Sequence, residues 1–321
     1  MPFGLAAVQR AAEVIRAGGL VAFPTETVYG LGADATNVAA VARIFAAKER
    51  PTSHPLIVHL ASADQVAGWA RHVPAAVQRL ADRFWPGPLT IILQRHPAVP
   101  DAVTGGQETV GLRVPDHPLA LALLGAAGCG VAAPSANRFG RVSPTCAEHV
   151  VVELGTRVDV VLDGGPCAVG LESTILDLST GRPRLLRPGA VSAEAIAGVL
   201  GEMPAGRTDQ SPRVPGALAA HYAPDTPVQL VDGPRIEALA EALVQAGRTV
   251  AVLARRPRSA DAPPCTWLAM PDDPGRYGHD LYARLRELDA LGCDRLLIQA
   301  PPADSAWAAV QDRLRRATGA G

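Results

Sequence analysis

The stretch GLVAFPTETVYGLG, residues 19–32, starts as an apolar run and breaks at Pro24 into the polar triplet Thr25-Glu26-Thr27. A short apolar run bounded by turn residues is typical of a buried strand. A polar turn that allows glycine after such a strand is how open α/β sheets form a crevice for a small molecule. An ordinary strand and turn would have much the same sequence. We therefore weigh this stretch together with three others, which are Lys48-Glu49-Arg50-Pro51, Ser135-Ala136-Asn137 and Arg187-Pro188-Gly189.

The length of 321 residues suits two domains. Residues 1–203 alternate short apolar strands with helices and hairpin-like turns, which predicts an α/β domain with a twisted mixed sheet. Residues 204–227 are rich in proline and show no periodic pattern, so we expect a linker, which is long enough to cross the face of the first domain. Residues 228–321 alternate strand and helix, which predicts a small Rossmann-like parallel domain. This domain lacks Gly-x-Gly-x-x-Gly after its first strand, so we expect no dinucleotide site there.

The composition excludes several classes of partner. The formal net charge is −1, so we expect no overall electrostatic attraction to RNA or anionic lipid. Aromatic residues make up 4% of the chain, too few for a surface that stacks single-stranded nucleic acid. The five scattered cysteines form no Cys-x-x-Cys pair, which is typical of free thiols in a reducing compartment. The most apolar run, residues 119–133, is shorter than the ~20 residues that span a bilayer. We therefore predict a soluble, cytoplasmic protein with no membrane partner.

Basic and polar side chains gather near the predicted turns of the first domain. Arg can bind a phosphate or carboxylate with two parallel hydrogen bonds, and Lys supplies a point charge. The mixture therefore suits binding of a phosphate, although the chain has no Gly-x-x-x-x-Gly-Lys-Ser/Thr loop. We also predict that Ser143-Pro144 begins a helix whose free N–H groups add to an anion site. The residues concerned are Lys48, Arg50, Arg113, Arg187, Thr25, Thr27, Thr109, Ser135, Asn137, Ser143 and Ser173.

Ordinary structural explanations exist for many of these residues. Lys48 and Arg50 lie at the predicted end of a helix, where cations suit the helix dipole. His59, inside a predicted strand, could be a core histidine with satisfied hydrogen bonds. Glu26 could act as a general base, but an acid in a turn usually faces water. Ser143 could be a simple cap.

Six motifs follow one another along the first domain: Pro24-Thr25-Glu26-Thr27-Val28-Tyr29-Gly30-Leu31, Lys48-x-Arg50-Pro51, Pro86-Gly87-Pro88-Leu89-Thr90, Pro134-Ser135-Ala136-Asn137, Glu172-Ser173-Thr174-Ile175 and Arg187-Pro188-Gly189. Together they resemble the YrdC-like fold. With His221-Tyr222-Ala223-Pro224 and the C-terminal domain, the chain from about residue 5 to residue 320 resembles the two-domain form of the threonylcarbamoyl-AMP synthase family. One departure is His54, which stands where the family more usually has Asn before Pro-Leu.

The resemblance implies a nucleotidyltransferase that joins L-threonine, bicarbonate and ATP into threonylcarbamoyl-AMP and releases pyrophosphate. The product would supply the threonylcarbamoyl group that tRNA-threonylcarbamoyl transferase proteins place on an adenosine of tRNA. A carbamate oxygen attacks the α-phosphorus of ATP, so positioning and charge neutralisation suffice. The resemblance also implies Mg²⁺ with the ATP, held mainly by phosphates and water because no acidic cage is visible. The sequence leaves direct binding of tRNA open.

The resemblance further implies a role for individual residues, and no metal ligand is among them. The catalytic residues would be Lys48, Arg50, Ser135 and Asn137. The residues that contact ATP would be Arg50, His54, Thr109, Ser135, Ser143, Arg187 and Tyr222, the last as a lid on the linker. The residues that hold threonine would be Thr27, His59, Arg113, Ala133 and Ser173, with Arg113 on the carboxylate.

Two alternative functions fit parts of the sequence. An RNA-binding protein would use the basic cleft directly on tRNA or double-stranded RNA, although the near-zero net charge counts against it. A carbamoyl-transfer enzyme on the same fold would carry additional catalytic and zinc-finger segments, which this sequence does not show. The sequence does not assign a role to the C-terminal domain.

Overall fold

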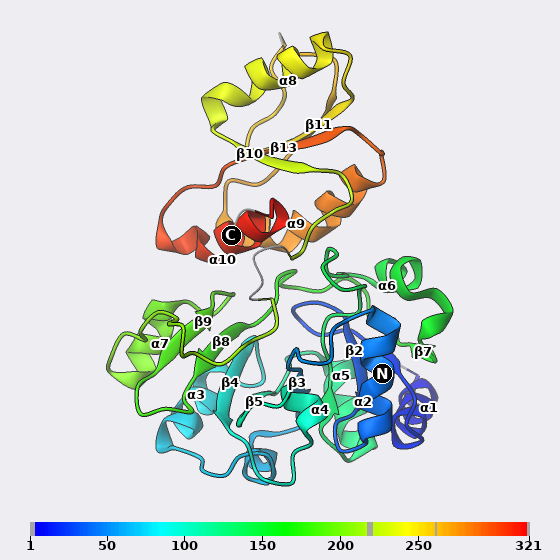
Figure 1. The fold of residues 1–321 in the computed structure, drawn as a ribbon, viewed down its shortest axis with the longest axis vertical. Helices are drawn as coiled ribbons and strands as arrows, with labels where there is room; N and C mark the ends of the chain where they lie inside the picture. The colour runs from blue at the N-terminus through cyan, green and yellow to red at the C-terminus, as the bar shows by residue number, and fades with distance from the viewer. Residues whose placement is uncertain (1–3, 217–220, 261, 320–321) are drawn as a thin grey trace. The chain divides into compact units, whose positions relative to one another are not determined.

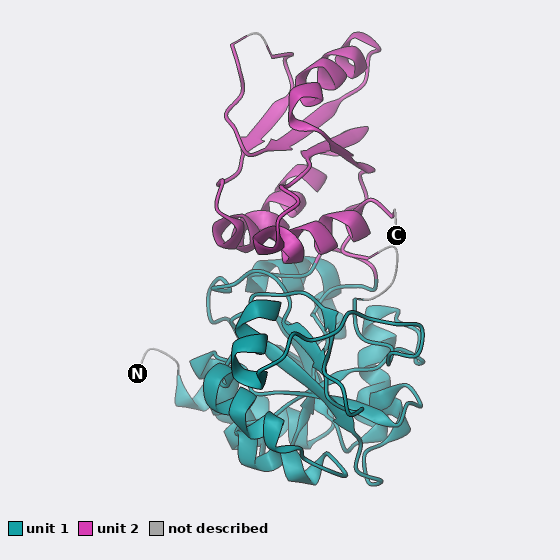
Figure 2. Ribbon diagram, turned by 90° about the vertical axis from the view of Figure 1, so that its left-hand side faces the viewer, with its two compact units in different colours: residues 1–139, 143–217 teal, residues 140–142, 218–321 magenta. Residues whose placement is uncertain are grey.

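The computed structural model describes residues 4–216, 221–260 and 262–319. The chain divides into two compact units, of which residues 1–139 and 143–217 form the first and residues 140–142 and 218–321 form the second (Figure 2). Of the predicted linker, residues 204–216 therefore group with the first unit and residues 221–227 with the second. Residues 217–220 of the linker lie outside the described residues.

The first unit is built on a mixed sheet with the strand order β7-β1-β2-β6-β3-β5-β4-β8-β9 (Figure 1). Both parallel pairs, such as β3 with β5, and antiparallel pairs, such as β4 with β5, occur within it. The predicted mixed α/β domain is thus confirmed. The strands are β1 (Val21–Phe23), β2 (Gly30–Asp34), β3 (Ile57–His59), β4 (Leu89–Gln94), β5 (Thr109–Arg113), β6 (Val131–Ala132), β7 (Val160–Val161), β8 (Thr174–Asp177) and β9 (Arg184–Arg187).

Helix α2 (Val38–Lys48) shows how local sequence sets the ends of an element. The side-chain oxygen of Asn37 accepts hydrogen bonds from the N–H groups of Ala39 and Ala40, each at 3.1 Å, which is a typical N-cap. The helix ends where Glu49 takes a left-handed conformation with φ of 54°, so that Lys48 is its last residue. The other helices of this unit are α1 (Leu5–Arg16), α3 (Ala75–Phe84), α4 (Asp101–Thr104), α5 (Pro118–Ala127), α6 (Ala147–Leu154) and α7 (Ala193–Leu200).

Gly32 allows β2 to pass between β1 and β6. A Cβ atom at this position would lie 2.7 Å from the Phe23 ring and 2.8 Å from Cγ1 of Val131. Only glycine tolerates such a close approach. The last glycine of the opening stretch therefore has a packing role.

The prediction that Ser143-Pro144 begins a helix is wrong, because α6 begins only at Ala147. The Ser143 hydroxyl donates to Oε1 of Glu172 at 2.5 Å instead of capping a helix. The carbonyl oxygen of Pro144 accepts from the N–H of Tyr29 at 2.9 Å. Both residues are held by distant segments, so the predicted anion site on helix N–H groups does not exist at this position.

Strand alternation gives the first unit two faces with different character. The main hydrophobic core lies on one face and includes Val58, Ile91, Leu112 and Leu176. The opposite face carries a smaller cluster, formed by Ile57, Ile92, Ile175, Leu186 and Val214. We call this second face of β3, β4, β5 and β8 the linker face, because Val214 belongs to the predicted linker. His59, Thr90 and Arg113 share it, since each is an even number of residues from a position on that side.

The second unit contains a parallel sheet with the strand order β10-β13-β11-β12. Helix α8 covers one side of this sheet, and α9 and α10 cover the other (Figure 1). The predicted parallel α/β arrangement is confirmed. Its elements are β10 (Val228–Val231), α8 (Ile236–Gln245), β11 (Val250–Ala254), β12 (Thr266–Ala269), α9 (Pro274–Asp289), β13 (Arg295–Gln299) and α10 (Ala308–Ala317).

None of the described helices is long and apolar enough to span a membrane.

Candidate active site

The turn after β1 closes on itself and then joins two other segments. Thr25 Oγ1 donates to the carbonyl oxygen of Val28 at 2.7 Å. The N–H of Tyr29 donates to Pro144, and its carbonyl oxygen accepts from the N–H of Ala136 at 2.8 Å. The opening stretch of the sequence therefore fixes both ends of the loop that follows β6.

Lys48 fastens the same loop from the end of α2. Its ammonium group donates to the carbonyl oxygens of Ser135 and Asn137, and only 1% of the residue is exposed. A buried ammonium is costly unless its hydrogens are paired, and the two carbonyl oxygens provide this pairing. Burial, and next the charge of Arg50, lower the pKa of Lys48 well below its usual value. Lys48 is also the only lysine of the chain, because every other basic residue is an arginine.

Arg50 and His54 both contact the ring of Phe139. The Arg50 guanidinium carbon lies 5.8 Å from the ring centroid, and the His54 ring lies at 5.1 Å with an interplanar angle of 90°. Arg50 Nη2 also donates to the carbonyl oxygen of Pro55 at 2.9 Å. Burial, and next the charge of Arg50, lower the pKa of His54. His54 is therefore neutral near pH 7, and the positive charge of this part of the site resides on Arg50.

Residues predicted to hold threonine meet at the ends of β3 and β5. His59 and Arg113 are direct neighbours in the register of these strands. Arg113 Nη2 lies 2.5 Å from Oε1 of Glu26, and both side chains are buried. Burial, and next the charge of Arg113, lower the pKa of His59 to about 3, so this imidazole is neutral. Thr27 lies in the neighbouring turn, where its hydroxyl is 2.8 Å from that of Thr25.

Ser173 is held by residues from β4 and β9. Arg187 Nε and Nη2 donate to the carbonyl oxygen of Ser173 at 3.0 and 2.9 Å, and Nη2 also reaches Ser173 Oγ at 3.1 Å. The hydroxyls of Ser173 and Thr90 lie 2.7 Å apart. Arg187 Nη1 donates to the carbonyl oxygen of Pro215 at 3.0 Å. These contacts fix two predicted site residues on the linker face.

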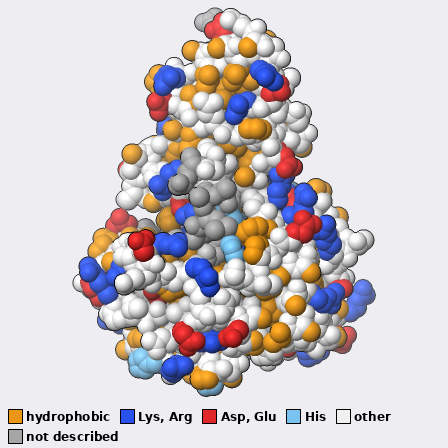
Figure 3. All heavy atoms as spheres, viewed as in Figure 1, with side chains coloured by type: hydrophobic (Ala, Val, Ile, Leu, Met, Phe, Trp, Pro, Cys, Tyr) orange, Lys and Arg blue, Asp and Glu red, His pale blue; other side chains and the backbone are white. Residues whose placement is uncertain are grey.

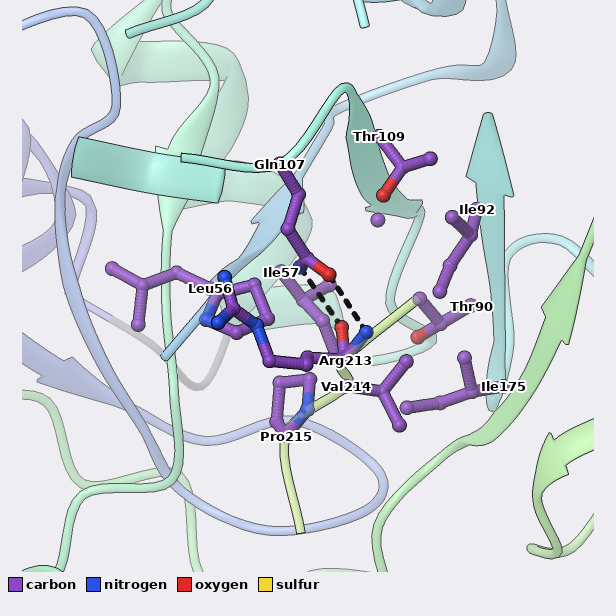
Figure 4. A pocket seen from close by; sticks show the side chains of 12 residues that line it. Leu56, Ile57, Thr90, Ile92, Gln107, Thr109, Ile175, Arg213, Val214 and Pro215 are labelled. Carbon is purple, nitrogen blue, oxygen red and sulfur yellow. Dashed lines mark hydrogen bonds between the residues drawn. The ribbon is translucent and has the colours of Figure 1, made fainter. Parts of the chain in front are cut away.

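The linker segment 213–215 lies in a groove of the linker face (Figure 4). Val214 packs with Ile57, Ile92 and Ile175 there. The side chain of Gln107 accepts from the N–H of Arg213 at 2.7 Å and donates to its carbonyl oxygen at 3.1 Å. The remaining volume is about 10 Å³, the space that one water molecule needs. The chain's own linker thus fills this groove, whose walls include the predicted ATP contact Thr109 together with Thr90.

Two further predicted residues have different placements. The N–H of Ala133 donates to the carbonyl oxygen of Ile57 at 3.0 Å, on the strand that carries His59, a residue predicted to bind threonine. Tyr222 belongs to the second unit, where its ring stacks on Tyr282 at 5.7 Å and lies 5.4 Å below the guanidinium of Arg313. The other candidate residues all belong to the first unit. A contact between Tyr222 and ATP stays a prediction.

Charged side chains and potential metal ligands are dispersed over the described parts of the chain. Within residues 4–216, 221–260 and 262–319, no group of three or more His, Cys, Asp and Glu side chains could hold a metal ion. Positive and negative side chains are interspersed over the visible face of the molecule (Figure 3).

The structure shows partners that the sequence did not assign to the site. Glu26 pairs with Arg113, Glu172 accepts the Ser143 hydroxyl, and Thr90 contacts Ser173. Each of the three stands inside a motif quoted above, and Glu26 and Glu172 lie directly beside the predicted site residues Thr27 and Ser173. Motif membership was therefore the available signal, although it did not reveal the partner.

Two family models together match nearly the whole chain. The model described as Telomere recombination matches residues 13–189, and the model described as Threonylcarbamoyl-AMP synthase, C-terminal domain, matches residues 191–319.

Curated relatives match over the same length. The threonylcarbamoyl-AMP synthase of Pyrococcus abyssi is 42% identical over 323 residues, which cover 97% of this chain and 94% of the relative. That of Bacillus subtilis is 42% identical over 327 residues, covering 97% and 93%. The crystal structure of P. abyssi Sua5 complexed with L-threonine aligns with a TM-score of 0.93 and 39% identity, covering 100% of this chain and 96% of that one.

The neutral state of buried His59 predicts how stability changes with pH. The pKa of this imidazole is about 3 in the folded chain and about 6.5 in the unfolded chain. Between these values the unfolded state binds the extra proton, so the free energy of unfolding falls as pH falls. The expected slope from this residue near pH 5 is about 1.4 kcal/mol per pH unit. Denaturant unfolding at several pH values should show that slope reduced in His59→Gln.

His72, which is exposed, provides the matched control. His72→Gln should keep the slope of the wild type. Equal slopes in wild type and His59→Gln would contradict the assignment of a buried, neutral His59.

Proposed function

The chain belongs to the threonylcarbamoyl-AMP synthase family, and we propose that its first unit joins L-threonine, bicarbonate and ATP with release of pyrophosphate. The observation that carries the proposal is 42% identity to a named synthase across 97% of the chain. The chain is thus an enzyme of tRNA modification, with L-threonine and ATP as substrates. The full-length match leaves no need for the RNA-binding or carbamoyl-transfer alternative.

Threonine would bind where the neutral imidazole of His59 and the charged guanidinium of Arg113 lie side by side. A guanidinium pairs well with a carboxylate, so Arg113 would take the threonine carboxylate. The hydroxyls of Thr27 and Ser173 supply hydrogen-bond partners of the right kind for the rest of the amino acid. A neutral threonine amine then attacks the carbon supplied by bicarbonate, which forms the carbamate and releases water.

The nucleotide would meet the basic and polar groups of the first unit. One carbamate oxygen attacks the α-phosphorus of ATP while the bond to the leaving pyrophosphate breaks. Negative charge develops on the phosphate oxygens, and preorganised donors stabilise such charge most effectively. Lys48 would act through the loop it fastens, because its ammonium sets the positions of Ser135 and Asn137. Arg50 would supply the adjoining positive charge.

Magnesium would enter as part of the substrate MgATP, with phosphates and water as its ligands. The product would pass to tRNA-threonylcarbamoyl transferase proteins in the cytoplasm. What supports these assignments is the family's reaction and the phosphate-binding character of the site residues.

Pyrophosphate release from ATP by the purified protein tests the function. We expect release in the presence of Mg²⁺ that requires both L-threonine and bicarbonate. Release that is the same without threonine would overturn the substrate assignment. L-Serine and a bicarbonate-depleted buffer serve as controls for the amino acid and for the carbon source.

Lys48→Ala should lower the rate of threonylcarbamoyl-AMP formation by roughly 10²-fold, the scale for displacing groups that position a reaction by about 1 Å. The loss follows because the carbonyl oxygens of Ser135 and Asn137 lose their shared donor. Arg43→Ala is the matched control, since Arg43 is a half-exposed cation on the same helix. Near-normal turnover of Lys48→Ala would contradict the role assigned to Lys48.

A further inference from the structure

Glu26 and Arg113 form a buried ion pair between the opening turn and the end of β5. Oε1 of Glu26 lies 2.5 Å from Nη2 of Arg113, and the two residues are 5% and 4% exposed. The pair lies on the linker face beside His59, where the proposed function places threonine.

Both carboxylate oxygens and the carbonyl oxygen of Glu26 accept hydrogen bonds. Its Oε1 accepts from Arg113, its Oε2 accepts from the N–H of Asp116 at 2.9 Å, and its carbonyl oxygen accepts from the N–H of Val169 at 2.7 Å. Each carboxylate oxygen of Glu26 thus has a donor within the protein, which fixes the side chain between Arg113 and the N–H of Asp116.

The guanidinium of Arg113 is held along one edge only. Nη2 pairs with Glu26, and Nε donates to the carbonyl oxygen of Gly87 at 3.3 Å. Among the residues that the structure describes, no hydrogen bond or ion pair uses Nη1 of Arg113. The orientation of the guanidinium is therefore fixed, while one nitrogen stays available for a ligand.

We propose that Glu26 is a positioning residue for L-threonine, because it holds Arg113 with Nη1 turned toward the substrate carboxylate. Removing one partner of a buried ion pair is costly, because the other charge is left buried without its partner. Arg113 therefore needs no reorganisation when threonine binds, and this preorganisation lowers the cost of binding. The inference rests on the proposed function, since it assigns Arg113 to threonine.

Glu26→Gln tests the inference with little change in volume. The amide replaces one acceptor oxygen by a donor NH₂, so the side chain can no longer serve both Arg113 and the N–H of Asp116. We expect the KM for L-threonine to rise by about 10- to 100-fold, the scale for losing an outer partner of a ligand-binding residue. The KM for ATP should stay within about two-fold, because a specific effect on one substrate leaves the other unchanged.

Glu26→Asp and Glu237→Gln complete the set. Glu26→Asp keeps the charge on a shorter side chain and should give a threonine KM between those of wild type and Glu26→Gln. It also keeps the test valid if Glu26→Gln does not fold. Glu237→Gln removes a carboxylate from a partly exposed Glu–Arg pair of the second unit, with a distance of 2.7 Å to Arg256, and should leave both KM values unchanged.

The outcomes separate the inference from the proposed function. A rise in both KM values together, or an unchanged threonine KM in both Glu26 variants, would overturn the positioning role. Arg113→Lys tests the underlying assignment: a raised threonine KM supports it, and an unchanged one overturns the assignment and the inference together. Threonine-independent pyrophosphate release by the wild type would instead overturn the proposed function itself.

Discussion

The two hydrogen bonds that the buried Lys48 side chain donates are the interaction on which the loop after β6 depends. Lys48 ends α2 and holds the carbonyl oxygens of Ser135 and Asn137, so one charge ties a helix to a loop that lies 87 positions further along the chain. A compact ammonium offers three donors that can turn to meet two carbonyl groups, whereas a guanidinium is planar and larger. A chain that uses arginine for all its other basic positions has lysine here. The loop is thus ordered by contacts within the protein.

Sheet geometry decides which residues can meet. Alternation along each strand sends one set of side chains into the main core and the other set to the linker face. His59, Thr90 and Arg113 come from three different strands, yet they share that face because the register aligns them. The linker then contributes Val214 to the same surface. The fold therefore gathers polar groups on a surface that also contains apolar residues, which suits a ligand with both kinds of group.

Local sequence predicted the elements well where the signal is local. The end of α2 near Arg50 and the parallel second unit could be anticipated because proline and periodicity act over a few residues. Contacts between residues far apart in the sequence could not be anticipated in this way. Ser143 reads as a cap, but its hydroxyl is taken by Glu172, 29 positions away. Glu26 reads as a turn acid facing water, but it pairs with Arg113, 87 positions away. The resemblance of the motifs indicated the candidate site residues, and only the folded chain shows which of them contact one another.

The buried state of Lys48 can be measured directly because no other lysine is present. Protein labelled with [ε-¹³C]lysine should give a single lysine signal in an NMR titration. The account predicts a pKa well below the value of about 10.4 that is typical of an exposed lysine. Addition of L-threonine and an ATP analogue that cannot be cleaved should perturb this signal, because the proposed function places both substrates beside the loop that Lys48 holds. A titration at the ordinary value, unchanged by substrates, would contradict the claim that this ammonium organises the site.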